Sequence, residues 1–212
     1  VAKTSPDFFR PNFWVSTPDI LTEYLQFGGR SAHKIRAAIA AMATPLWGMY
    51  AGYELIESVA RPGAEEHIDS EKYEFKARDW AAAEKSGRSI APYISKLNEI
   101  RKKHPAVRQL RNLELHHVDD GSMLVFSKHL DAAHTGTKKS DTVIVVANLD
   151  PHAVRESTVH LDLAKLGLPQ DSRFEVTDLI SNETYEWGTS NYVRLDPRDE
   201  PVHIFKVGKV TS

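Results

Sequence analysis

The sequence predicts an α/β segment followed by an all-β segment, with the change near residue 105. Two short apolar runs, residues 13–15 and 46–50, are each followed along the chain by apolar residues at helical spacing, which indicates buried strands alternating with helices. After residue 105, β-branched runs and turn residues recur at roughly the 8–12-residue spacing of a β-sandwich. We therefore expect an α/β unit over residues 1–105 and a β-sandwich over residues 106–212.

Helices are expected at three places in the first half. A short helix follows Leu21 and is closed by Gly28 and Gly29, and a second begins at an N-cap, Ser31, and stops at Pro45. Apolar residues at spacings of three and four support the second helix, namely Ile35, Ala38, Ile39 and Met42. A third helix begins at an N-cap, Ser89, and ends at His104-Pro105.

Residues 55–88 form a long, charged connection with little periodicity. Connections of this length without secondary structure are usually functional or disordered. Aromatic residues stand among the charges in residues 69–73 and 78–80, so we expect an ordered loop that faces a ligand.

The second half contains a series of predicted strands separated by turns. The strongest is residues 142–148, and the turn Asp119-Asp120-Gly121 is expected to be a hairpin turn within residues 113–130. Residues 135–140 are expected to form a flexible hairpin tip. The remaining predicted strands lie near residues 157–161, 173–178, 183–187, 192–195 and 202–207.

Composition excludes several classes of protein. Cysteine is absent, which favours a reducing cytoplasmic location, and there is no secretory signal pattern or apolar run long enough to span a membrane. The net charge is −2 and the basic residues are scattered, which argues against nucleic-acid binding.

One carboxylate, Asp19, is placed where chemistry is expected. It follows the first apolar run through Ser16-Thr17-Pro18, at the carboxyl end of a predicted strand, and catalytic residues of a (β/α) barrel occupy such positions. The competing interpretation is an N-cap of the following helix. Two strands cannot close a barrel that needs eight, so the chain is either a small α/β layer or the last part of a larger enzyme.

Several motifs resemble the α-amylase family, glycoside hydrolase family 13. They are Thr17-Pro18-Asp19-Ile20-Leu21, the pattern Gly48-x-Tyr50-x-Gly52-x-Glu54, and Arg101-x-x-His104-Pro105-Ala106. Thr-Pro-Asp in place of the family's usual Asn-His-Asp, together with residues 69–73 and 78–80, resembles the bacterial maltosyltransferases of that family. The resemblance implies strands seven and eight of a (β/α)8 TIM barrel with their helices over residues 1–105, and a C-terminal antiparallel β-sandwich over residues 106–212.

The resemblance implies a retaining transfer of maltosyl from maltose 1-phosphate to the non-reducing end of an α-1,4-glucan. Asp19 would be the carboxylate that stabilises the transition state, and Lys72 and Tyr73 would hold the outer glucose of the maltosyl unit. The nucleophile, the general acid and the phosphate-binding residues would lie upstream, so we expect a fragment that is inactive in isolation. A homodimer and no cofactor are also implied.

Some positions and alternatives remain open. Ser16 stands where the family pattern has asparagine, and Glu54 matches a structural glutamate more than a ligand. Residues 78–80 could line the sugar site or form an ion pair with a packed indole. Rival functions are another glucan hydrolase or glucanotransferase, or a non-catalytic carbohydrate-binding module with aromatic platforms such as Trp187 and Tyr192.

A metal site is not expected. His116-His117 precedes Asp119-Asp120, but neighbouring residues of a strand point to opposite faces, and the spacing matches no known ligand pattern.

Overall fold

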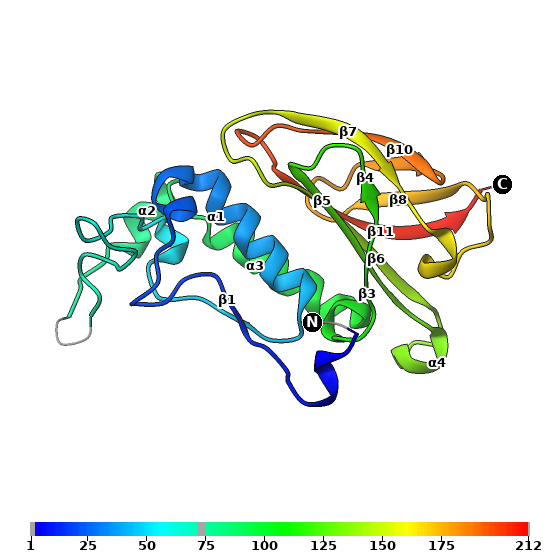
Figure 1. Ribbon diagram of the computed structural model, residues 1–212, viewed down its shortest axis with the longest axis horizontal. Coiled ribbons are helices and arrows are strands. Elements are labelled where there is room, and N and C mark those ends of the chain that lie inside the picture. Colours follow the sequence, from blue (N-terminus) through cyan, green and yellow to red (C-terminus); the bar gives the residue numbers. More distant parts are fainter. Residues whose placement is uncertain (1–2, 72–74, 212) are drawn as a thin grey trace.

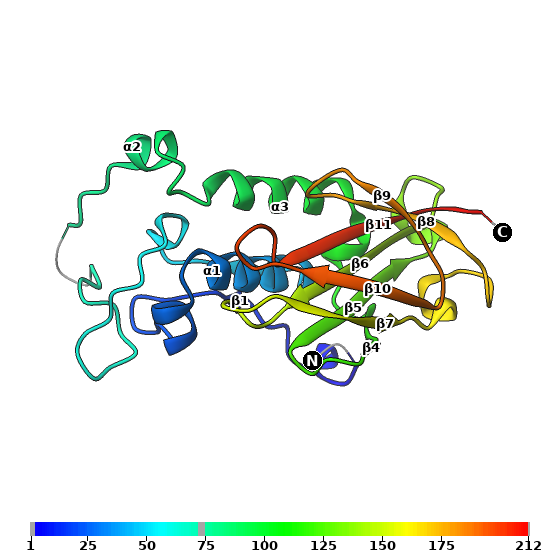
Figure 2. The ribbon, with the colours of Figure 1, turned by 90° about the horizontal axis from the view of Figure 1, so that it is seen from above.

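The chain is arranged in three layers, with a large sheet between two helices and a small sheet (Figures 1 and 2). The structure is a computed structural model that describes residues 3–71 and 75–211. Within these residues the large sheet has the order β3-β5-β6-β11-β8-β9 and the small sheet the order β10-β7-β4.

All neighbouring strands within the large and small sheets are antiparallel, which confirms the antiparallel β-structure predicted for the second half. The strands of the large sheet are β3 (Leu113–Leu115), β5 (Met123–Leu130), β6 (Asp141–Asn148), β8 (Phe174–Asp178), β9 (Thr184–Trp187) and β11 (Val202–Val210). Those of the small sheet are β4 (His117–Val118), β7 (Arg155–His160) and β10 (Ser190–Leu195).

Strand β6 is buried on both faces. Val143, Val145 and Ala147 belong to the apolar core shared with the helices, whereas Ile144 and Val146 belong to the core shared with the small sheet. Successive side chains of a strand point to opposite faces, so a strand between two cores must be apolar at every position. This explains why residues 142–148 gave the strongest strand pattern in the chain.

Two long helices, α1 (Glu23–Ala43) and α3 (Ala91–Lys103), cover the face of the large sheet that is turned away from the small sheet. Figure 2 shows them lying side by side. Shorter helical segments are α2 (Trp80–Lys85), α4 (Ala132–Thr135), η1 (Ser5–Asp7), η2 (Tyr53–Leu55), η3 (Pro105–Arg108) and η4 (Leu163–Leu166). In the described part of the chain, none of the helices combines the length and apolarity needed to cross a membrane.

The first half contributes a short parallel pair of strands, β1 (Phe13–Trp14) and β2 (Trp47–Gly48). Hydrogen bonds extend the pairing by a residue at each end, from Phe13 N–H to Leu46 C=O and from Val15 N–H to Gly48 C=O, both 3.0 Å. The two predicted strands are therefore confirmed in place but are shorter than the apolar runs. The described residues do not form a closed barrel.

The predicted division of residues 21–45 into two helices is confirmed, and only the predicted N-cap of the second helix is wrong. Element α1 consists of two helical stretches that meet at a kink at Gly29, whose φ of 57° and ψ of −147° are not helical. Ser31 lies inside α1 and its hydroxyl donates to Pro197 C=O at 2.5 Å, so it is not an N-cap. Ser89 lies two residues before α3, where its hydroxyl accepts from Ala91 N–H at 3.0 Å.

The predicted hairpin around residues 119–121 is confirmed, because β3 and β5, on either side of the turn, are antiparallel neighbours in the large sheet. Met123 N–H donates to Asp120 C=O at 3.0 Å within the turn. The sequence did not predict that β4, just before the turn, pairs with β7 of the small sheet. The tip expected at residues 135–140 does join two paired strands, because Leu130 of β5 lies opposite Asp141 of β6.

A buried lysine ties the helical layer to the large sheet. Lys128 on β5 is 1% exposed, and its ammonium donates to Ala43 C=O at 2.9 Å, to Val107 C=O at 3.3 Å and to Gln109 C=O. An ammonium has three N–H donors, so each donor has a carbonyl partner. Lys128 thus satisfies carbonyl groups at the end of α1 and around η3.

We predict that Lys128→Met lowers the free energy of unfolding by about 2 kcal/mol or more, because it leaves carbonyl groups without a donor in a buried place. Urea denaturation followed by circular dichroism measures this. Lys206→Met is the matched control, since Lys206 is an exposed residue of β11. Equal stability of the two variants would contradict the role given to Lys128.

Candidate functional site

The carboxyl ends of β1 and β2 define one edge of the α/β unit. Because the two strands are parallel, the residues that follow them emerge at the same edge. Asp19 follows β1 in a tight turn, in which Thr17 and Ile20 exchange backbone hydrogen bonds of 3.1 and 3.2 Å. Asp19 is exposed there, as a carboxylate that must meet a ligand would be.

The N-cap interpretation of Asp19 is wrong. Helix α1 begins at Glu23, and its N-cap is Thr22, three residues after Asp19. Ser16, which replaces the family's asparagine, is buried at 4% exposure, so the change lies beneath this edge rather than on it.

The long connection between β2 and α3 lies against the same edge. Leu21 N–H donates to Glu65 C=O at 2.7 Å, and Glu23 N–H donates to the Glu65 carboxylate at 3.2 Å. The connection is thus anchored next to the turn that carries Asp19. Figure 1 shows it extending beyond the helices, on the side of the molecule opposite the C-terminus.

One arginine of this connection, Arg78, joins two acidic residues that are distant in sequence, Glu57 and Glu71. The Arg78 side chain is 5% exposed and binds both oxygens of Glu57, at 2.8 Å from Nε and 3.1 Å from Nη2. Its Nη1 donates to Glu71 at 3.0 Å. A guanidinium matches a carboxylate in this two-bond arrangement, which fixes direction as well as distance.

Two further groups complete the network around Arg78. Tyr50, just after β2, donates its hydroxyl to Glu71 at 2.8 Å, and Lys76 donates to Glu57 at 3.1 Å. Hydrogen bonds from Tyr50 and Arg78 lower the pKa of Glu71. Burial would raise the pKa of Glu57, but hydrogen bonds from Arg78 and Lys76 lower it below its usual value. Both carboxylates are therefore held in the charged form.

Glycine is required where the network meets β2. Gly52 has a φ of 99°, and a Cβ there would lie 2.3 Å from the Glu57 carboxylate. Glu54 accepts from Gly52 N–H at 3.2 Å, and its backbone carbonyl accepts from Ile90 N–H at 2.8 Å. Glu54 is thus engaged in shaping this bend, in keeping with the structural interpretation.

Residues 78–80 have different roles. Arg78 forms the ion pair that was one of the two interpretations, and Asp79 caps α2 by accepting from Ala82 N–H at 2.9 Å. Trp80 is 42% exposed, and the Arg78 guanidinium lies 5.9 Å from its ring. Lys72 and Tyr73 lie outside the described residues. Glu71 and Lys76, which lie before and after them in the sequence, both belong to the network.

The sequence did not single out Glu57 and Lys76. The available signal was the high charge of the connection, in which lysine and arginine residues are interspersed among more numerous acidic residues over residues 54–79. That pattern indicates ion pairs but not their partners, because Glu57 and Arg78 are 21 residues apart.

An apolar groove of about 730 Å³ lies beside β1 and α1. It is lined by Phe13, Trp14, Val15, Tyr24 and Ile39, among others, with Arg36 as a charged member. Trp14 is 51% exposed at this groove. Such a surface is suited to packing against further protein rather than to binding a charged sugar phosphate.

The aromatic residues of the β-sandwich differ in exposure. Trp187 is 5% exposed and packs on Phe205, with ring centroids 4.5 Å apart, so it belongs to the core. Tyr192 is 65% exposed and donates its hydroxyl to Glu156 at 2.8 Å. Trp187 therefore does not form an exposed sugar platform.

Comparison with known proteins finds similar sequences along almost the whole chain. Residues 115–207 match the family model described as GLGE, C-terminal. The chain is 48% identical over 206 residues to α-1,4-glucan:maltose-1-phosphate maltosyltransferase 2 of Streptomyces coelicolor, covering 97% of this chain. It is 48% identical to the maltosyltransferase of Mycobacterium tuberculosis over 205 residues, or 96% of this chain.

The chain is homologous to the α-1,4-glucan:maltose-1-phosphate maltosyltransferases. It spans 30% of the length of the Streptomyces protein and 28% of the Mycobacterium protein. The resemblance read from the motifs is thereby confirmed.

Solved structures of the α-amylase family share the fold. The α-amylase of Geobacillus thermoleovorans, in complex with acarbose, superposes with a TM-score of 0.61 at 15% identity, covering 94% of this chain and 39% of that one. AmyP in complex with maltose gives a TM-score of 0.58 at 14% identity, covering 96% of this chain and 42% of that one. At this identity the likeness concerns the fold alone.

We predict that Arg78→Ala loosens residues 57–78, because it removes the donor that joins Glu57 to Glu71. Hydrogen exchange at pH 7 should show faster exchange across this connection, including Lys76 N–H, which donates to Glu71 at 3.2 Å. Arg61→Ala is the control in the same connection, since the Arg61 side chain, which pairs with Glu66, is 59% exposed. Similar exchange in both variants would contradict the central role of Arg78.

The same network predicts a dependence on pH. Carboxylates with a lowered pKa stabilise the folded state above their ordinary value of 4.5, and this contribution is lost as the pH falls through the lowered values. The contribution of these two carboxylates should therefore be constant above about pH 5 and be lost in more acidic solution. Burial lowers the pKa of His67 in the same connection from its ordinary 6.5, so protection of residues 57–78 should begin to fall below that pH and fall further below about pH 5. The Arg78→Ala variant should show a weaker dependence.

Proposed function

We propose that this chain is the last part of a retaining maltosyltransferase, which transfers maltosyl from maltose 1-phosphate to the non-reducing end of an α-1,4-glucan. The observation that carries the proposal is the 48% identity to named maltosyltransferases along almost the whole chain. The position of Asp19 at the carboxyl edge of a parallel strand pair supports it independently.

The proposal assigns two parts to the chain. Residues 1–105 would supply strands seven and eight of a (β/α)8 barrel, as β1 and β2, and residues 106–212 would be the C-terminal β-sandwich. The apolar groove beside β1 and α1 supports this division, since a preceding strand and helix of a barrel would cover it. The chain would then be a fragment of a longer enzyme.

Asp19 would stabilise the transition state. In a retaining transfer a carboxylate nucleophile and a general acid act about 5 Å apart, and positive charge develops at the anomeric carbon. A third, fixed carboxylate beside that carbon is worth more in the transition state than in the ground state. The nucleophile and the acid would come from the preceding part of the enzyme.

Lys72 and Tyr73 would hold the outer glucose of the maltosyl unit. A lysine ammonium donates to several hydroxyl groups, and a tyrosine offers a hydroxyl and an apolar ring face. The network around Arg78 supports this assignment, because it anchors Glu71 on one side of these residues and Lys76 on the other.

Rival functions have less support. Another α-amylase-family hydrolase or glucanotransferase would carry Asn-His-Asp, where this sequence has Thr17-Pro18-Asp19. A carbohydrate-binding module would need several exposed coplanar aromatics, and of the two candidates Trp187 is buried, which leaves Tyr192 alone exposed. The proposed enzyme would be a cytoplasmic homodimer that needs no cofactor.

We predict that Asp19→Ala in the complete enzyme lowers kcat by about a thousandfold or more, because it removes charge that acts in the transition state. Phosphate release from maltose 1-phosphate in the presence of glucan measures this. Lys72→Ala should raise KM more than it lowers kcat. Glu99→Ala, which removes an exposed carboxylate from α3, should change neither. A near-normal kcat for Asp19→Ala would refute the assigned role.

We also predict that purified residues 1–212 release no phosphate from maltose 1-phosphate, because two of the three required carboxylates would be missing. The complete enzyme is the positive control. Clear turnover by the 212-residue chain would show that it holds a complete site, and would overturn the fragment interpretation.

A further inference from the structure

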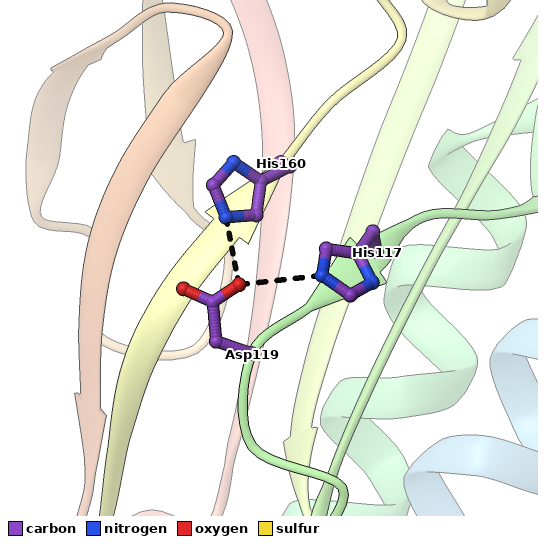
Figure 3. Close-up of side chains that lie close together, drawn as sticks. All are labelled: His117, Asp119 and His160. Carbon is purple, nitrogen blue, oxygen red and sulfur yellow. Dashed lines mark hydrogen bonds and ion pairs between the residues drawn. The ribbon is translucent and has the colours of Figure 1, made fainter.

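Three side chains that could bind a metal ion meet on the β-sandwich. They are His117 on β4, Asp119 just after it, and His160 at the end of β7 (Figure 3). Figure 3 shows the Asp119 carboxylate between the two imidazole rings. This cluster lies outside everything assigned to sugar transfer above.

The pairing of β4 with β7 explains how the cluster forms. His117 and His160 are direct partners in this antiparallel register, so their side chains stand on the same face. Asp119 is two residues beyond His117 and therefore points to that face as well. His116 points away, and its Nε2 lies 2.7 Å from the Ser127 hydroxyl, as expected for adjacent residues of a strand. The sequence missed the cluster because its third member comes from a strand 41 residues further along.

The distances suit a small divalent cation. The Asp119 Oδ1 lies 2.9 Å from His160 Nε2 and 3.3 Å from His117 Nε2, and all candidate ligand atoms lie within 4.8 Å of one another. With zinc–ligand bonds of about 2.0–2.1 Å, neighbouring ligands of a tetrahedron are about 3.3–3.4 Å apart. Small side-chain rotations would therefore create the site without moving the strands.

One histidine is already oriented for coordination. His160 Nδ1 lies 3.1 Å from the Ser190 hydroxyl on β10. When Nδ1 donates to such an acceptor, Nε2 carries the lone pair, and metal-binding histidines commonly use their second nitrogen in this way. The same Nε2 faces Asp119 and His117.

We propose that His117, Asp119 and His160 form a binding site for a divalent transition-metal ion of the zinc type. Imidazole and carboxylate ligands suit zinc and its neighbours, whereas magnesium and calcium prefer oxygen ligands alone. The exposed fractions of the three side chains are 74%, 56% and 39%, so a fourth coordination position is open to water or a small anion. The residues provide three protein ligands, as in open zinc sites.

The bound ion would stabilise the pairing of β4 with β7 at the edge of the small sheet. Strand β4 is an edge strand of the small sheet and pairs with β7 at just two positions. A metal joining His117 and Asp119 to His160 adds a cross-strand link at this point. The competing arrangement has no metal, and Asp119 then accepts hydrogen bonds from the two imidazoles.

Titration of metal-free, tag-free protein with Zn²⁺ by calorimetry tests the proposal, with Co²⁺ as a spectroscopic probe. We expect one ion per chain, visible absorption bands typical of tetrahedral Co²⁺ with imidazole ligands, and a higher midpoint of thermal unfolding when Zn²⁺ is present. His160→Gln and Asp119→Asn should each weaken binding at least tenfold. Asp119 is exposed, so its substitution keeps the test valid if His160→Gln folds poorly.

The control is His134→Gln, which removes an exposed histidine from α4 and should leave Zn²⁺ affinity unchanged. Absence of Zn²⁺ binding would overturn the proposal in favour of the hydrogen-bonded cluster. Binding that is insensitive to Asp119→Asn and His160→Gln, or reduced equally by His134→Gln, would indicate surface histidines in general and would overturn it too.

Discussion

The double burial of β6 is the constraint on which the rest of the structure depends. Val143 and Val145 need a cover on one face of the large sheet, and Ile144 and Val146 need one on the other. Helices α1 and α3 supply the first cover and the small sheet supplies the second. Because each apolar face excludes water only when its cover is in place, the three layers stabilise one another.

This layering also fixes the proposed catalytic edge. Helix α1 is held on the sheet by its apolar face and by polar contacts near its start and its middle, from Tyr24 to Leu149 C=O at 3.0 Å and from Lys34 to Glu200 at 2.5 Å. The turn with Asp19 comes immediately before α1, and the connection anchored at Glu65 lies beside it. The β-sandwich therefore positions an edge to which it contributes no proposed ligand.

Local sequence patterns predicted most of the helices and strands, but they did not predict which distant residues contact one another. The apolar run of β6, the helix before His104 and the exposed turn at Asp19 follow from neighbours in sequence, which fix periodicity and turn residues. The pairing of Arg78 with Glu57 and of His117 with His160 depends on how distant segments meet. No local property of these side chains encodes that meeting, so the ion network and the candidate metal site became visible in the structure alone.

The shared core has a consequence for how the chain can be divided. The change of pattern near residue 105 looks like a boundary in sequence, yet Val143, Val145 and Ile204 of the sheet lie in one cluster with Leu97 of α3. A chain cut there would present a wide apolar sheet face to water and would be prone to aggregate. Exchange of sandwiches between related enzymes would therefore have to carry the helices along, or rebuild the surface that they cover.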